Sequence, residues 1–81
     1  MVIAEPAANW LDLLSPRQQD VALLIGRGLT NRQIADELVV SPRTVEWHVA
    51  NLLGKLGLET RGQLALWIHE HVPATLARDD G

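Results

Sequence analysis

Cysteine is absent from this 81-residue chain, and so are phenylalanine and tyrosine. Without cysteine, disulfide scaffolds, zinc fingers and thiol chemistry are excluded. The three tryptophans are the only aromatic residues, so the core must be mainly aliphatic, and a hydrophobic share of 47% is enough to build one. No stretch approaches the ~20 apolar residues of a membrane span, and the first ten residues lack the pattern of a signal peptide. The chain is therefore expected to form one small intracellular domain.

Excess charge of either sign is also absent from the centre of the chain. The net charge is −3, but residues 15–72 hold six basic and six acidic residues and are neutral. The negative charge therefore lies in the two ends, which argues only mildly against a polyanionic partner such as DNA.

Signals for catalysis or for a bound cofactor are missing as well. The sequence offers no nucleophile–base pair, no phosphate-binding loop and no cluster with metal-ligand spacing. His69 and His71 are two residues apart, so on a helix they point to different faces. His48 falls on the apolar side of its segment, which favours a buried, hydrogen-bonded side chain. We expect neither enzymatic activity nor a metal, cofactor or small-molecule site.

Four segments carry helix-start signals followed by apolar residues at three- and four-residue steps. The starts are Ser15, Thr30, Ser41 and Thr60, each followed by proline at the first position, by glutamine at the third, or by both. The first and third helices are expected to stop at Gly28 and Gly57, and the last at Pro73. The predicted fold class is all-α, a four-helix bundle-like domain with a central helix-turn-helix.

The second and third helices form that motif. A short helix, the three-residue turn 39–41 and a longer helix over about 42–56 have helix-turn-helix spacing. Ala35 is a small residue where the two helices must approach closely. In this motif the second helix enters the major groove of double-stranded DNA, which is just wide enough to admit it.

The run LSPRQQDVALLIGRGLTNRQIADELVVSPRTVEWHVANLLGKLGL, followed by Arg61, resembles the LuxR/GerE-type DNA-binding domain. The likeness covers residues 14 to about 72 without gaps. It holds at Arg17, Gly28, Thr30, Asn31, Ile34, Ala35, Ser41, Thr44, Val45, His48, Asn51, Lys55, Leu56, Gly57 and Arg61, among others. It implies a sequence-specific transcriptional regulator whose third helix reads DNA and whose last helix is often used for dimerisation.

The resemblance also sets the expected division of the chain. Residues 1–13 would be an N-terminal extension, 14–72 the domain, and 73–81 an acidic flexible tail. Domains of this family usually form the C-terminal part of longer regulators, and a few are stand-alone proteins. We therefore expect this chain to be either a stand-alone regulator or the DNA-binding part of a longer one. The expected location is the cytoplasm, in association with the nucleoid.

The sequence departs from the family pattern in the third helix. A frequent lysine is Glu46 here, and the next basic position is Ala50. Glu46 is expected either to accept a hydrogen bond from a base or to pair with Arg43 one turn earlier. Trp47 is expected to contact DNA, to pack on the surface or to meet another protein. Thr44 matches a position that contacts the DNA backbone in the family.

Together these arguments predict two sites. The DNA-binding residues are Asn31, Arg32, Arg43, Thr44, Glu46, Trp47, Asn51, Lys55 and Arg61. The interface of a homodimer through the last helix comprises Gln63, Leu66, Trp67 and Glu70. The alternative is a degenerate helix-turn-helix that acts as a protein–protein interaction module and modulates another regulator; the acidic total and the departures at 46 and 50 motivate it.

Overall fold

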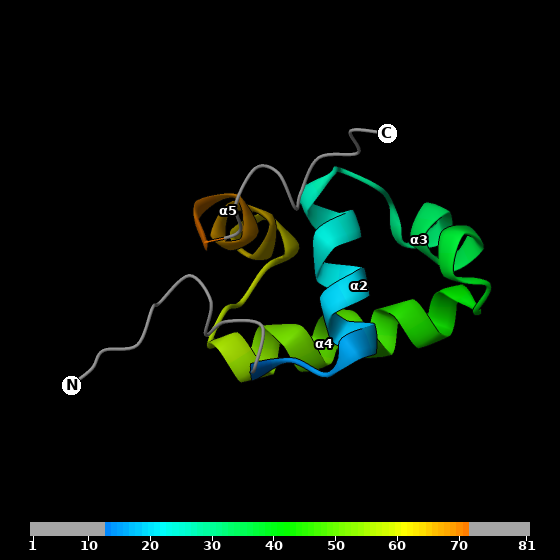
Figure 1. The fold of residues 1–81 in the computed structure, drawn as a ribbon. Helices are drawn as coiled ribbons and strands as arrows, with labels where there is room; N and C mark the ends of the chain where they lie inside the picture. The colour runs from blue at the N-terminus through cyan, green and yellow to red at the C-terminus, as the bar shows by residue number, and fades with distance from the viewer. Residues whose placement is uncertain (1–12, 72–81) are drawn as a thin grey trace.

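The computed structural model describes residues 13–71, which form four helices (Figure 1). They are α2 (Pro16–Gly26), α3 (Asn31–Leu38), α4 (Pro42–Leu56) and α5 (Arg61–His71). No strand occurs within the described range, and the predicted all-α fold is confirmed. None of these helices combines the length and apolar character that crossing a membrane requires. The predicted extension, apart from Leu13, and the predicted tail lie outside the described residues.

Local hydrogen bonds between side chain and backbone define the helix starts. The Ser15 hydroxyl accepts from the Gln18 N–H at 3.2 Å, and the Gln18 side-chain oxygen accepts from the Ser15 N–H at 3.0 Å. These bonds satisfy donors that the first turn of a helix leaves unpaired. The same reciprocal pair joins Thr30 to Gln33 and Thr60 to Gln63. The predicted capping boxes are therefore confirmed.

Within residues 13–71, three residues with positive φ follow the ends of helices, and the sequence predicts only two of them. Gly28 (φ 90°) follows α2, and Gly57 (φ 71°) follows α4, as the sequence predicts. The third is Val39, which ends α3 with φ 58° and ψ 51°. A β-branched side chain is strained in this left-handed conformation. The turn of the helix-turn-helix therefore stores strain at Val39.

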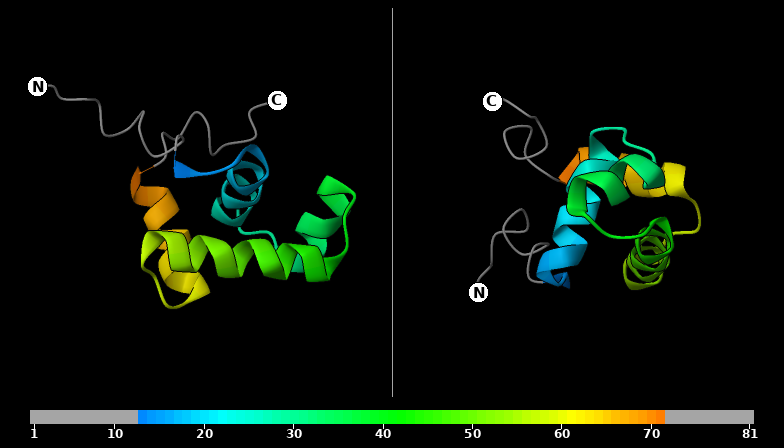
Figure 2. Two further views of the ribbon diagram at one scale, coloured as in Figure 1. Left: turned by 90° about the horizontal axis from the view of Figure 1, so that it is seen from below. Right: turned by 90° about the vertical axis from the view of Figure 1, so that its right-hand side faces the viewer.

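Helix α2 crosses α4 and also packs against α5, while α3 and α5 lie near opposite ends of α4 (Figure 1). Glycine permits the closest approach between α2 and α5, because a Cβ at Gly26 would lie 2.7 Å from Cγ2 of Ile68. Ala35 is buried where α3 meets α4, as expected. The aliphatic core consists of Leu14, Val21, Ala22, Leu24, Ile25, Ile34, Ala35, Val45, Val49, Leu52, Leu64 and Ile68. This packing leaves one long side of α4 without a neighbouring helix among the described residues (Figure 2).

Candidate nucleic-acid interface

The open side of α4 carries a single stripe of exposed residues. Arg43, Trp47, Ala50 and Gly54 recur at four, three and four residues, so they lie along one line of the helix. Trp47 is 61% exposed, whereas Val45, Val49 and Leu52 on the opposite side are buried. The fold thus presents one straight, uncovered helix face, which is the shape that a DNA groove accepts.

The N-terminus of α4 is held by Ser41. Its hydroxyl accepts from the Thr44 N–H at 3.1 Å and lies 3.0 Å from the Thr44 hydroxyl. Thr44 is half-buried, and its hydroxyl is engaged with the Ser41 cap in this structure. The remaining amide groups of the first turn carry the partial positive charge of a helix N-terminus.

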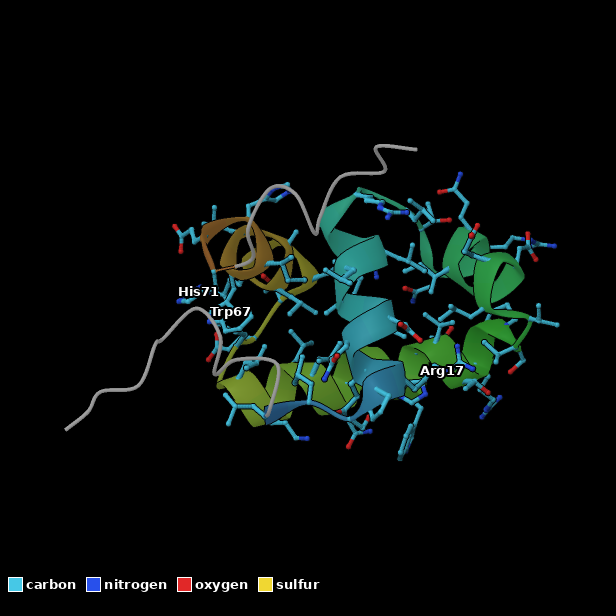
Figure 3. All side chains as sticks on the ribbon, in the orientation of Figure 1. Arg17, Trp67 and His71 are labelled. Carbon is cyan, nitrogen blue, oxygen red and sulfur yellow. The ribbon has the colours of Figure 1, made fainter. Side chains whose placement is uncertain are left out.

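Glu46 is exposed, and its carboxylate makes no ion pair with Arg43. An ion pair on a neighbouring helix joins Arg17 to Asp20, with 3.7 Å between Nη1 and Oδ2. The pairing of Glu46 with Arg43, one of the two expected alternatives, is therefore not seen. Arg17 is the second residue of α2, at the end of that helix that meets α4 (Figure 3). It adds a half-exposed cation, partly neutralised by Asp20, that the sequence-based assignment omitted.

Two polar side chains flank the stripe. The Asn51 side-chain amide donates to the Trp47 backbone oxygen at 2.7 Å, so it lies along its own helix. The His48 ring meets the Trp47 ring edge-on, with centroids 5.1 Å apart. His48 is only half-buried, and its buried Nδ1 has no hydrogen-bond partner. The expectation of a buried, hydrogen-bonded histidine is thus wrong, because no polar group of a neighbouring helix reaches Nδ1.

Lys55 reaches from the end of α4 to the start of α2. Its Nζ donates to the side-chain oxygen of Gln18 at 3.0 Å. Gln18 is buried, and the same oxygen also accepts from the Ser15 N–H. The side-chain amide of Gln18 thus completes the N-terminal cap of α2 and binds the Lys55 ammonium beside this cap. Lys55 itself is exposed, so its charge remains accessible at this junction.

Two further residues assigned to DNA contact lie side by side. The Arg61 guanidinium donates to Oδ1 of Asn31 and, at 2.6 Å, to the backbone oxygen of Leu29. Both side chains are half-buried. Arg32, the neighbour of Asn31, is exposed. The structure therefore uses Arg61 to join the starts of α3 and α5, a role that the sequence did not reveal.

The four residues assigned to a dimer interface lie along one side of α5. They line an open groove of about 500 Å³ whose walls are Gly57, Leu58, Glu59, Gln63, Leu66, Trp67 and Glu70. Leu66 is 59% exposed. Trp67 is half-buried and stacks on His71, with ring centroids 4.3 Å apart (Figure 3). Gln63 also accepts from the Glu59 N–H, which fixes the loop before α5. This groove lies at the opposite end of α4 from α3.

A sequence model described as "Bacterial regulatory proteins, luxR family" matches residues 12–68. The chain belongs to the luxR family. It therefore carries the DNA-binding helix-turn-helix domain of a transcriptional regulator, and the resemblance seen in the sequence is confirmed.

Several relatives are substantially identical to this member of the luxR family. A Mycobacterium tuberculosis protein whose name describes an HTH-type transcriptional regulator is 48% identical over 59 residues, covering 73% of this chain and 7% of that protein. The nitrate/nitrite response regulator protein NarL of Escherichia coli is 40% identical over 57 residues (70% and 26%). The two-component response regulator PprB of Pseudomonas aeruginosa is 44% identical over 68 residues (84% and 24%). The chain thus spans about a quarter or less of each relative.

Proposed function

We propose that this chain binds specific double-stranded DNA sequences, with α4 in the major groove. The observation that carries the proposal is the uncovered stripe of α4, opposite its buried side and positioned by α3 across the turn. Phosphate contacts give affinity, and the exposed middle of α4 gives specificity. The activity is binding, with no catalytic step and no cofactor, in the cytoplasm on the nucleoid.

The cations divide by exposure. Arg32 and Arg43 are exposed and unpaired within the described residues, so they meet phosphates. Lys55 contributes beside the capped start of α2, and the first turn of α4 around Thr44 presents amide dipoles to the backbone. Asn31 and Arg61 act together as one unit, their amide and guanidinium groups facing a phosphate from the start of α3. Asn51 faces the groove from beside Trp47.

A homodimer through α5 completes the proposal. Exposed Leu66 and the open groove beside it support a two-fold contact, in which each copy offers the same surface. Gln63, Trp67 and Glu70 surround Leu66 on this surface. A dimer would place two α4 helices on half-sites about one turn of DNA apart. The rest of a longer regulator would supply the signal, as the partial coverage of its relatives suggests.

A salt titration tests DNA binding. Fluorescence anisotropy of a labelled random-sequence duplex is measured from ~50 to ~200 mM salt. The four cations assigned to phosphates in each chain give a log–log slope of about −3.6. Arg43→Ala should weaken binding and make the slope shallower by about one. Arg27→Ala is the matched control, because Arg27 follows the end of α2 that lies away from α4 (Figure 1). No binding at ~50 mM salt, or equal effects of both variants, would contradict the proposal.

The second candidate is a protein-interaction module, which the exposure of Trp47 and the unpaired Glu46 favour. An apolar contact to a protein would depend little on salt, because it releases no condensed counterions. The same titration therefore separates the two functions. A duplex that binds with a steep slope excludes the module as the main activity.

A further inference from the structure

The outward face of α4 is poor in hydrogen-bond donors. From Glu46 to Gly54 its exposed residues are Glu46, Trp47, Ala50 and Gly54. The cations of the helix stand at its two ends, and the one near the C-terminus is bound to Gln18. Guanine offers two acceptors in the major groove and is read by arginine or lysine. The middle of α4 therefore lacks the arginine or lysine that usually reads guanine.

Glu46 can only accept hydrogen bonds when it is ionised. It is exposed and makes no ion pair within the described residues, so its carboxylate stays available to a ligand. The groove edges that donate are the exocyclic amines of cytosine and adenine, and glutamate pairs with the cytosine amine. Thymine and guanine would place an acceptor oxygen against the carboxylate.

Trp47 offers the complementary apolar contact. Trp47 is 61% exposed, and its ring packs against the His48 ring in a T-shaped contact. Along the same stripe stand Ala50 and Gly54, and no atom lies within 4 Å of a Cβ added at Gly54. A base edge can therefore approach this stretch closely. The apolar group on the major-groove edge of DNA is the thymine C5 methyl.

We propose, on the basis of the DNA-binding function above, that α4 selects neighbouring cytosine and thymine bases. Glu46 accepts from the cytosine N4 amine, and Trp47 covers the thymine methyl. Adjacent residues of a helix project about 100° apart around its axis, so Glu46 lies beside the stripe that holds Trp47, and the two side chains contact different, neighbouring base pairs. The preferred half-site thus presents amines and methyl groups to the middle of α4.

The test begins with selection of bound duplexes from a random pool by the wild-type chain. In the selected site, thymine is then replaced by deoxyuridine, which removes only the methyl group. We expect about fourfold weaker binding by the wild type, the value of one buried methyl group. Trp47→Ala should bind both duplexes equally. Deoxyuridine at a thymine outside the selected positions is the matched control.

The carboxylate is tested at the cytosine. Exchange of the C·G pair for T·A should weaken wild-type binding about 5- to 100-fold. Glu46→Gln should lose most of this preference, because an amide both donates and accepts. A deoxyuridine effect that persists in Trp47→Ala, or a cytosine preference that persists in Glu46→Gln, overturns the inference.

The outcomes also separate this inference from the function on which it rests. Salt-dependent binding without a cytosine–thymine preference overturns the base assignment and leaves DNA binding intact. Absence of DNA binding at low salt contradicts both the base assignment and the DNA-binding function. Both side chains are exposed, so neither variant should disturb folding, and helical circular dichroism checks this.

Discussion

The Arg61 guanidinium donates to the side-chain oxygen of Asn31, so the first residue of α5 is joined to the first residue of α3. A second bond to the Leu29 backbone oxygen fixes the loop before α3. Both bonds use a charged donor and are partly buried, which makes them stronger than bonds between neutral exposed groups. The cation therefore stabilises the orientation of the helix-turn-helix, whether or not a phosphate also contacts it.

Removal of Arg61 should destabilise the domain. We expect Arg61→Ala to lower the free energy of unfolding by ~1–3 kcal/mol, because it leaves Asn31 and the Leu29 carbonyl without their donor. Arg61→Lys should recover only part of the loss, since an ammonium lacks the planar fork of a guanidinium. Urea denaturation measures both, with exposed Arg32→Ala as the control, expected within about 0.5 kcal/mol of wild type. Equal unfolding midpoints for Arg61→Ala and Arg32→Ala would show that the guanidinium has no structural role.

Relief of strain at Val39 should stabilise the domain. Val39 has φ 58° and is 88% exposed, so its side chain contributes little packing. Asparagine tolerates the left-handed conformation, and we expect Val39→Asn to raise the free energy of unfolding by ~1 kcal/mol. Val40→Asn is the matched control, because Val40 packs partly against the core and should destabilise when replaced. Thermal unfolding of the two variants should move in opposite directions, and a lower melting temperature for Val39→Asn would refute the strain argument.

Two glycines inside helices should respond oppositely to alanine. A Cβ at Gly26 would lie 2.7 Å from the buried Ile68 side chain, and overpacking of this kind costs ~1–3 kcal/mol. Gly26 is the last residue of α2, so the gain in helix propensity is below the ~1 kcal/mol of a helix interior and does not offset this cost. At Gly54 a Cβ meets no atom within 4 Å, so Gly54→Ala should gain up to ~1 kcal/mol. Chemical denaturation measures the free energy of unfolding of both variants. A stabilising Gly26→Ala would mean that α2 and α5 can move apart without a loss of stability.

The features that the sequence predicts are those formed by residues three or four apart. The boxes at Ser15 and Thr30 involve side chains that reach the backbone of the same turn, so spacing alone predicts them. The same spacing allows the stacking of Trp67 on His71 four residues later, but many residue pairs share this spacing, so it does not by itself predict a ring contact.

The contacts that the sequence does not predict join distant segments. Lys55 meets Gln18 across 37 residues and Arg61 meets Asn31 across 30. From the sequence alone, each cation is interpreted as a solvated or phosphate-binding side chain. Its partner cannot be predicted, because the partner depends on how the helices pack. The strain at Val39 is hidden for a related reason, because the angle between α3 and α4 sets its φ and valine itself disfavours it.

Dimerisation through α5 is best tested at Leu66. This side chain is 59% exposed in one copy, whereas Trp67 is half-buried and its removal would also weaken the core. Burial of a leucine is worth ~1.5–3 kcal/mol, and a two-fold interface buries two copies, so Leu66→Glu should weaken the dimer at least about 100-fold. Leu13→Glu is the matched control, with the same change at a leucine that is 56% exposed and precedes α2. Sedimentation equilibrium should find dimers for wild type and Leu13→Glu and monomers for Leu66→Glu. Identical masses for all three chains would exclude α5 as the interface, since a glutamate pair could not remain buried face to face without a large loss of affinity.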